Sequence, residues 1–329
     1  MIFMVPVRTS HSSISLDGIE RASQFIDPVF LNTPQFRSDS LSSLLGMDMV
    51  LKVETVNPIR SFKGRGTEYF LSCQLEGPKT LVCASAGNFG QGLAYSARKR
   101  GCQAVVFAAQ SANALKVERM RELGAEVRLA GSNFDEAKEH ALRFAEETGA
   151  RFVEDGSQPE VAEGAGTIAV ELGRWANLFD VLLIPLGDGA LLAGIGRWMK
   201  THSPSTRMIG VCPEGAPAMA MSWREGKLCT TESGSTIADG IAVSVPVPES
   251  LENLKTLMDD VLLVDDAAMI DAMRLVLRYH GLVMEPSGVA GLAAAMTFKQ
   301  QFQGARVATP LCGGNVTAEQ MQRWFAKAS

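Results

Sequence analysis

Short β-branched or apolar runs, each followed by a glycine-containing turn and then a segment of helical period, recur along this chain. Such alternation is typical of βαβ units, in which helices join parallel strands. The first series predicts strands at residues 81–84, 104–109 and 126–129 and helices at residues 93–100, 112–123 and 134–148. These segments form one compact α/β layer.

A second series of the same kind follows. It predicts strands at residues 181–184, 208–211 and 261–264 and helices at residues 267–279 and 287–301. No Pro/Gly/Ser-rich linker or internal repeat separates the two series, so a boundary near Ala150 rests on their rhythm alone. We therefore predict an α/β protein of two lobes, each a twisted, mostly parallel sheet flanked by helices.

Charge and apolar composition exclude two classes of partner. The net charge is −5 at pH 7 and no basic stretch stands out, which argues against a nucleic-acid binder. The longest apolar run, residues 181–195, contains Pro185, Gly187 and Asp188 and is too short to span a bilayer. Residues 1–7 lack the charged lead-in of a secretory signal, and none of the six cysteines forms a C-x-x-C pair. We expect a soluble cytoplasmic protein.

The histidines do not suggest a hydrolase. None of the four lies in an H-E-x-x-H or G-x-S-x-G context. Acid–base chemistry would then depend on lysine, carboxylates or a cofactor that accepts electrons.

Lys63 is the first candidate for a reactive side chain. It follows a turn-forming Asn57-Pro58 pair and stands at the start of a predicted helix, with Ser61 as a plausible N-cap. A lysine there faces the positive end of the helix dipole, which favours the neutral amine needed for attack on a carbonyl. The alternative from the residues alone is an ordinary solvated lysine.

Two glycine-containing turns follow predicted strands and could hold anions with backbone N–H groups. Residues 85–92 read Ser-Ala-Gly-Asn-Phe-Gly-Gln-Gly and suit a carboxylate, although their glycines could merely permit close packing. Residues 184–194, with Gly187 and Gly189, suit a phosphate. Cys312 ends a late strand before two glycines, where it is either a site residue or a small buried side chain.

Several segments in order resemble one family, the pyridoxal 5′-phosphate (PLP) enzymes of fold type II, and within it the serine/threonine dehydratase and serine racemase branch. The segments are residues 14–22, 32–34, 51–55, 61–66, 235–243, 285–288 and 312–315. The resemblance implies a large PLP-binding domain of residues 1–75 and 151–329 and a small substrate-gating domain of residues 76–150. It also implies a homodimer that acts on a small amino acid.

The resemblance assigns roles to individual residues. Lys63 would bind the cofactor covalently and act as base at Cα, Phe62 would pack on the cofactor ring, and Asn88 would hydrogen-bond the ring hydroxyl. Cys312 would face the pyridine nitrogen and leave it unprotonated, which suits elimination.

Two loops complete this set. The phosphate would be held by backbone N–H groups of Gly187, Asp188, Gly189, Ala190 and Leu191. The substrate carboxylate would be held by Ser85, Ala86, Gly87, Asn88 and Phe89.

Departures from the family pattern refine the prediction. Asp188 and Ala190 interrupt the usual four glycines, and we expect the Asp188 side chain to point away from the phosphate. Ala86 replaces the serine of serine racemases, which favours elimination over racemisation, and Phe89 replaces a common histidine. Ala220 stands where a cation ligand would accompany Glu214, so no metal is expected.

We therefore predict a PLP-dependent dehydratase that converts a β-hydroxy-α-amino acid to a 2-oxo acid and ammonia. The substrate would be threonine or serine, or a β-aryl serine such as phenylserine if Phe89 favours bulk. The alternatives are a β-replacement or threonine-synthase-like PLP enzyme and a non-catalytic ligand-binding relative.

Overall fold

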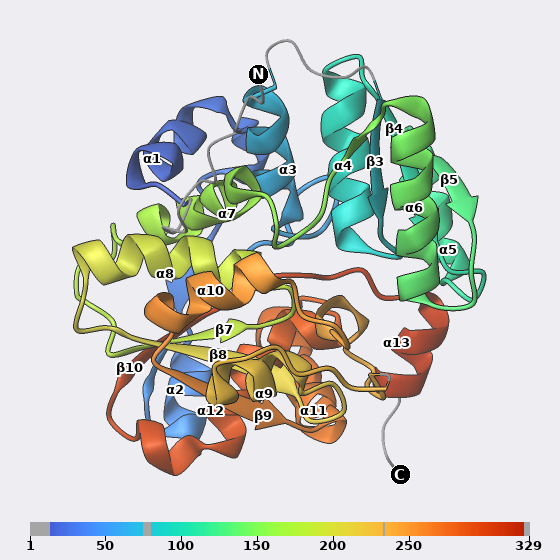
Figure 1. Ribbon diagram of the computed structural model, residues 1–329. Helices are drawn as coiled ribbons and strands as arrows, with labels where there is room; N and C mark the ends of the chain where they lie inside the picture. Colours follow the sequence, from blue (N-terminus) through green and yellow to red (C-terminus); the bar gives the residue numbers. More distant parts are fainter. Residues whose placement is uncertain (1–13, 75–79, 233, 326–329) are drawn as a thin grey trace.

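Two separate sheets divide the chain into two lobes in the computed structural model, which describes residues 14–74, 80–232 and 234–325 (Figure 1). Residues 1–7, on which the expected lack of a secretory signal rests, lie outside the described residues. Among the described residues, no helix is long and apolar enough to cross a membrane.

The larger sheet has six strands in the order β1-β2-β10-β7-β8-β9. They are β1 (Gln35–Arg37), β2 (Asp48–Val53), β10 (Arg306–Leu311), β7 (Val181–Pro185), β8 (Arg207–Pro213) and β9 (Asp260–Val264). The β1–β2 pair is antiparallel and the other four pairings are parallel. The three predicted strands of the second series are confirmed as β7, β8 and β9.

Alternate residues of these strands enter two different apolar cores. In β7, Leu182 and Ile184 join one core, and Val181 and Leu183 join the other. The first core lies under α7 (Pro159–Leu172), α8 (Ala190–His202), α9 (Ala218–Glu225) and α10 (Pro248–Leu257). The second lies under α2 (Asp39–Leu45), α11 (Asp266–His280) and α12 (Ala290–Thr297). Both faces are thus covered, as parallel sheets require.

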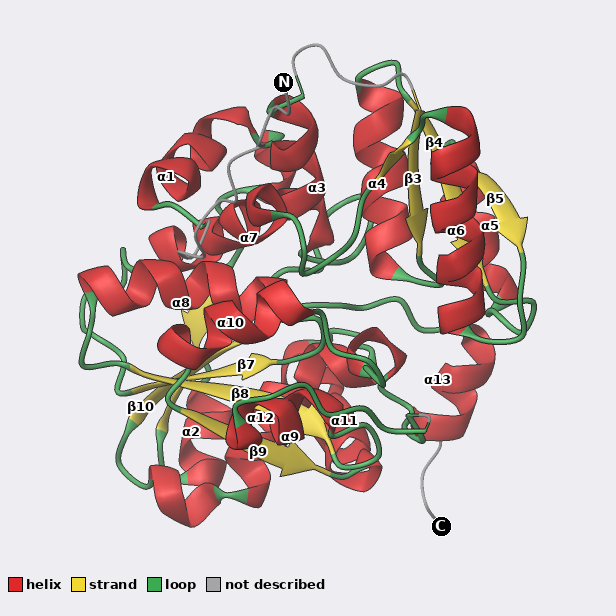
Figure 2. Ribbon diagram, in the orientation of Figure 1, coloured by secondary structure: helices red, strands yellow, loops and turns green. Residues whose placement is uncertain are grey.

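The smaller sheet is wholly parallel, in the order β5-β4-β3-β6. Its strands are β3 (Thr80–Ala84), β4 (Gln103–Ala108), β5 (Glu126–Leu129) and β6 (Arg151–Phe152). Its helices are α4 (Asn88–Lys99), α5 (Ala114–Glu122) and α6 (Phe134–Thr148), with α4 and α6 on opposite faces of the sheet (Figure 2). The sheet runs to Phe152, just beyond the predicted boundary near Ala150.

The remaining elements connect the lobes or close the larger one. They are α1 (Leu16–Phe25), η1 (Pro28–Phe30), α3 (Lys63–Ser72), η2 (Asp239–Ile241), η3 (Pro286–Val289), η4 (Lys299–Phe302) and α13 (Ala318–Phe325). The predicted single helix over residues 287–301 is wrong, because this stretch divides into η3, α12 and η4. Helix α3 packs against both α4 and α7 and so spans the junction of the lobes.

The expectation that Ser61 caps the helix before Lys63 is also wrong. Helix α3 begins at Lys63, its N-cap is Phe62, and no side chain caps it. Ser61 instead forms a bridge with Gly313, and its backbone N–H donates to Asn57 Oδ1 at 3.3 Å. The Asn57 side chain also donates to the Ser61 carbonyl, so it fixes the Ser61 backbone in the turn. The Ser61 hydroxyl is buried without a hydrogen-bond partner.

Candidate active site

A cavity of about 420 Å³ lies where the carboxyl ends of strands from both sheets meet. Strand β3 leads into it at Ser85, β7 at Gly187 and β10 at Cys312, as expected for ligand sites in open parallel sheets. All predicted site residues line it, namely Phe62, Lys63, Ser85, Ala86, Gly87, Asn88, Phe89, Gly187, Asp188, Gly189, Ala190, Leu191 and Cys312. The fold thus gathers segments that are far apart in the sequence.

Lys63 is not a solvated surface lysine. Its side chain is 15% exposed, and its ammonium forms an ion pair with Asp155. The ammonium also lies 4.5 Å from the centroid of the Phe62 ring. The amine is therefore held inside the cavity, at the first residue of α3.

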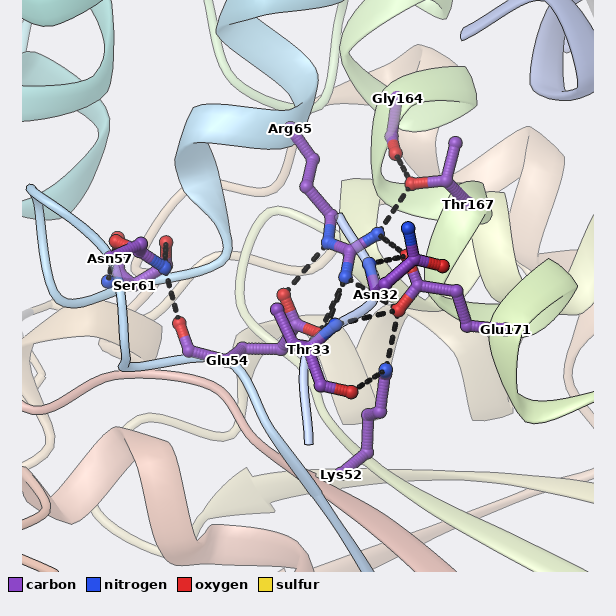
Figure 3. Close-up of polar contacts among 10 residues, drawn as sticks. All are labelled: Asn32, Thr33, Lys52, Glu54, Asn57, Ser61, Arg65, Gly164, Thr167 and Glu171. Atoms are coloured by element: carbon purple, nitrogen blue, oxygen red, sulfur yellow. Dashed lines mark hydrogen bonds and ion pairs between the residues drawn. The ribbon is translucent and has the colours of Figure 1, made fainter. Parts of the chain in front are cut away.

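Arg65, two residues along the same helix, fixes the first turn of α3 (Figure 3). Its guanidinium is completely buried and donates to Glu54 from Nε at 2.8 Å and to Glu171 from Nη1 at 2.7 Å. Lys52 binds the second oxygen of Glu171 and also donates to the Thr33 carbonyl at 2.7 Å. This network ties the helix that carries Lys63 to β2 and α7.

The charges in this network depend on one another. Burial opposes ionisation of Glu171, but hydrogen bonds and charge from Arg65, with a further contribution from Lys52, lower its pKa to about 2. Burial also lowers the pKa of Lys52, despite the attraction of Glu54 and Glu171. Removing either partner would leave a buried charge uncompensated.

The turn before α4 is organised by the Ser85 hydroxyl. It accepts hydrogen bonds from the backbone N–H groups of Gly87 at 3.2 Å and Gly90 at 3.0 Å. A methyl group added at Gly87 would contact nothing within 4 Å, so the backbone there is open. Such a turn can take up a carboxylate.

The loop before α8 presents an uncapped helix N-terminus to the cavity. Gly189 is the N-cap with φ 94°, and no side chain satisfies the first N–H groups of the helix. A Cβ at Gly189 would stand 2.4 Å from the Ser250 hydroxyl, which explains the glycine. The free N–H groups and the helix dipole suit a phosphate.

Asp188, in this loop, lies against the turn at Gly156. A Cβ added at Gly156 would stand 3.1 Å from the Cβ of Asp188. Burial and then the charge of Asp155 raise the pKa of Asp188 to about 7. The expectation that it points away from a phosphate stays a prediction. A protonated Asp188 would not repel an anion bound at this loop.

Asn88, Cys312 and the buried Glu285 line the same cavity. Asn88 Nδ2 donates to Glu285 Oε1 at 2.6 Å, and Asn315 donates to Asn88 Oδ1 at 2.7 Å. Burial raises the pKa of Glu285, and burial raises the pKa of the Cys312 thiol to about 12. Cys312 therefore remains a neutral thiol.

Sequence reasoning missed three contributors to the cavity. Asp155 follows β6, which at two residues is too short to show an alternating pattern. Lys116 of α5 and Asp239 of η2 form an ion pair between the lobes, although they are far apart in the sequence. No local signal marks such a pair.

Comparison with known proteins gives the family. The model of the pyridoxal-phosphate dependent enzymes matches residues 26–313. The chain belongs to this family. It is 35% identical over 316 residues to an L-threonine ammonia-lyase of Thermotoga maritima, covering 95% of this chain and 79% of the relative. It is also 31% identical to a serine racemase of Oryza sativa subsp. indica, covering 92% and 91%.

Solved structures agree with this family membership. Maize serine racemase superimposes with a TM-score of 0.88 at 29% identity, covering 95% of this chain and 97% of the other. The processed form of threonine deaminase isoform 2 from Solanum lycopersicum gives 0.86 at 28% identity, covering 98% of each chain. The fold is that of the PLP enzymes of fold type II, in their serine/threonine dehydratase branch.

The residues present fit the cofactor of the family. Lys63 is an enclosed amine, the N-terminus of α8 lacks a side-chain cap, and the buried Cys312 is a neutral group. All three line one cavity. They supply the groups needed for an aldehyde, a phosphate and a ring nitrogen respectively.

Proposed function

We propose that this chain is a PLP-dependent ammonia-lyase that removes water from a β-hydroxy-α-amino acid of the threonine and serine class, releasing a 2-oxo acid and ammonia. The observation that carries the proposal is the placement of Lys63, at the start of α3, in one cavity with the uncapped N-terminus of α8. The relatives named threonine ammonia-lyase and threonine dehydratase support it.

The residues that line the cavity would have different roles. Lys63 would hold the cofactor and take the Cα proton, because its amine lies within the cavity. Backbone N–H groups of residues 187–191 would hold the phosphate, Asn88 the ring hydroxyl, and Phe62 one side of the ring. When bound, the cofactor withdraws electrons from Cα of the amino acid.

The remaining groups favour elimination. Cys312 is a neutral thiol and does not hold a proton on a ring nitrogen as a carboxylate would. The turn of residues 85–89 would bind the substrate carboxylate and orient the leaving group. Ala86 offers no hydroxyl to return a proton to Cα.

The character of the side-chain pocket bears on the choice of substrate. Phe89 is buried in the apolar core and also lines the cavity. The exposed side chains of Phe134 and Val245 line the cavity as well. We propose that this apolar lining admits a β-aryl serine beside threonine and serine. Comparing kcat/KM for phenylserine, threonine and serine tests this, and a negligible value for phenylserine would reject it.

The test of the function itself is Lys63→Ala. Wild-type protein should release 2-oxo acid and ammonia from threonine or serine and show the absorbance of a covalently bound cofactor. The variant should lose both. A cofactor that borohydride still attaches to the variant would contradict the assignment, and accumulation of a replacement product in wild type would favour a β-replacement enzyme.

We further propose a cytoplasmic homodimer. The family resemblance supports the dimer, and the six cysteines, none of which is in a disulfide, fit a reducing compartment. Light scattering at several concentrations measures the mass in solution.

A further inference from the structure

Asp155 brings a second chemical group to the Lys63 amine. It follows β6 and lines the cavity, and its Oδ2 contacts the Lys63 ammonium. Its side chain is 11% exposed, and Oδ1 is buried without any hydrogen-bond partner. A buried oxygen with no partner is costly and is expected where a ligand completes the site.

The backbone holds Asp155 in place. On one side, the Val153 N–H donates to the Val82 carbonyl at 2.8 Å, which continues the parallel sheet. On the other side, Gly156 adopts φ +87° and packs against Asp188. The carboxyl is therefore directed into the cavity by rigid neighbours.

A second carboxyl makes this site one that holds a proton. Asp188 lies on the adjoining loop, and burial, then the charge of Asp155, raise its pKa to about 7. Asp188 is therefore a neighbouring carboxyl that can hold a proton near neutral pH, while Asp155 contacts the Lys63 ammonium. A phosphate bound by this same loop would make Asp188 retain that proton more strongly still.

Three other acids that line the cavity are already engaged. Glu285 accepts from Asn88 with one oxygen and from the Asn315 N–H with the other. Glu154 pairs with Lys138, and Asp239 pairs with Lys116. Among the described acidic residues that line the cavity, Asp155 has the one buried oxygen that lacks a partner.

Geometry relates Asp155 to the leaving group. If Lys63 takes the proton from Cα, a carboxyl in contact with the Lys63 amine lies within reach of the substituent on Cβ. Hydroxide is a poor leaving group at neutral pH, so the departing oxygen must receive a proton. Asp155 is placed to give it.

We propose that Asp155 is the general acid that protonates the departing β-hydroxyl, an inference that rests on the proposed function. The Lys63 amine takes the Cα proton, the Cα–Cβ double bond forms, and the Cβ–O bond breaks. The Asp155 proton passes to that oxygen, which leaves as water. The Asp155 carboxylate regains a proton from the Lys63 ammonium, so that no other reactant is consumed.

The experiment compares two leaving groups in wild type and Asp155→Asn. Chloride leaves without a proton, whereas hydroxide does not. We expect kcat/KM for serine and threonine to fall roughly 10²- to 10⁴-fold in the variant. Initial rates with β-chloroalanine should stay within about threefold. Equal losses on all three substrates, or no loss on serine, would overturn the proposal.

Two further measurements separate chemistry from structure. Cofactor loading is measured by absorbance titration and by borohydride trapping with mass spectrometry, and Asp155→Asn should load as wild type does. Loss of loading in the variant would show instead that Asp155 serves the cofactor and would overturn the proposal. Asp135→Asn, the same change at an exposed position on the rim of the cavity, is the matched control and should leave all rates unchanged.

A conservative variant covers the case in which Asp155→Asn folds poorly. Asp155→Glu keeps the acid and should retain more activity on serine than Asp155→Asn or Asp155→Ala does. Indistinguishable rates for the three variants would count against an acid at this position. If the wild type eliminates neither chloride nor hydroxide, the proposed function fails. If the wild type eliminates both, the comparison of the variants tests the role of Asp155 alone.

Discussion

Arg65 shows how a residue near Lys63, the proposed catalytic lysine, can be structural. Its position in the Ser-Phe-Lys-Gly-Arg-Gly segment resembles a site motif, yet its guanidinium is enclosed by Glu54 and Glu171. Placing the ion pairs at the base of α3 holds Lys63 without occupying the cavity. A residue motif of this kind therefore combines one chemical group with the anchor that orients it.

Glu171→Gln tests this anchor through pH. The folded pKa of Glu171 is lowered from 4.5 to about 2, so its contribution is present above pH 4.5 and is lost as pH falls toward 2. We expect the free energy of unfolding of the variant at pH 7 to be roughly 3 kcal/mol lower than that of the wild type. Urea denaturation should show that this difference in the free energy of unfolding becomes smaller below about pH 4.5. Glu147→Gln, on the exposed face of α6, should change stability by less than about 0.5 kcal/mol.

Ala86 offers a second test at the scale of one residue. It lines the cavity beside Ser85 but has no group that can exchange protons with Cα. We expect wild type to racemise its substrate poorly and Ala86→Ser to increase the ratio of racemisation to elimination by several-fold. Chiral chromatography of the remaining amino acid measures the ratio. Rapid racemisation by wild type would contradict this interpretation.

At the scale of elements, the first turn of α8 combines a strained cap with unsatisfied N–H groups. Gly189→Ala would place a methyl group against Ser250 in a left-handed conformation. We expect a loss of stability of about 1–3 kcal/mol and at least tenfold weaker cofactor binding, measured by absorbance titration.

Gly226→Ala is the matched control for this change. Gly226 is the C-cap of α9 at φ 70°, and a methyl group there would contact nothing within 4 Å. It should lower stability through backbone conformation while leaving the cofactor affinity unchanged. Equal weakening of cofactor binding in both variants would show that the effect is not local to α8.

At the scale of the whole molecule, an ion pair at the cavity is among those that join the lobes. Lys116 is 7% exposed and its partner Asp239 is 55% exposed. Burial opposes the charge on Lys116, but Asp239 and Glu285 raise its pKa, so the pair persists at neutral pH and is lost only at strongly alkaline pH. The small lobe is thus held over the larger one.

Lys116→Met should loosen this closure. We expect KM to rise about five- to tenfold, corresponding to roughly 1 kcal/mol, and amide hydrogen exchange in α5 to quicken. Arg119→Met removes an ion pair within the same helix, to Glu122, and should change neither quantity. Unchanged KM in Lys116→Met would mean that other contacts hold the lobes together.

The alternation of strands and helices, the glycine turns and the prominence of Lys63 could all be predicted from the sequence, because these depend on neighbours within a few positions. Prediction failed where a contact with a more distant residue decides the local structure. Ser61 was expected to cap a helix, but its backbone bonds to the Asn57 side chain and forms a bridge with Gly313. The helix predicted over residues 287–301 is interrupted for a similar reason, since Gly288 approaches the Gly313 backbone closely.

Which groups meet in the cavity depends on the tertiary structure. Asp155 lies 92 positions from Lys63, and Glu171 lies 106 positions from Arg65. Neither pairing follows from any local pattern, because contact between such residues depends on how the sheets stack and where strands end. The sequence therefore determines that a lysine at a helix start and two glycine-containing turns are present, and the fold determines which carboxyls share their cavity.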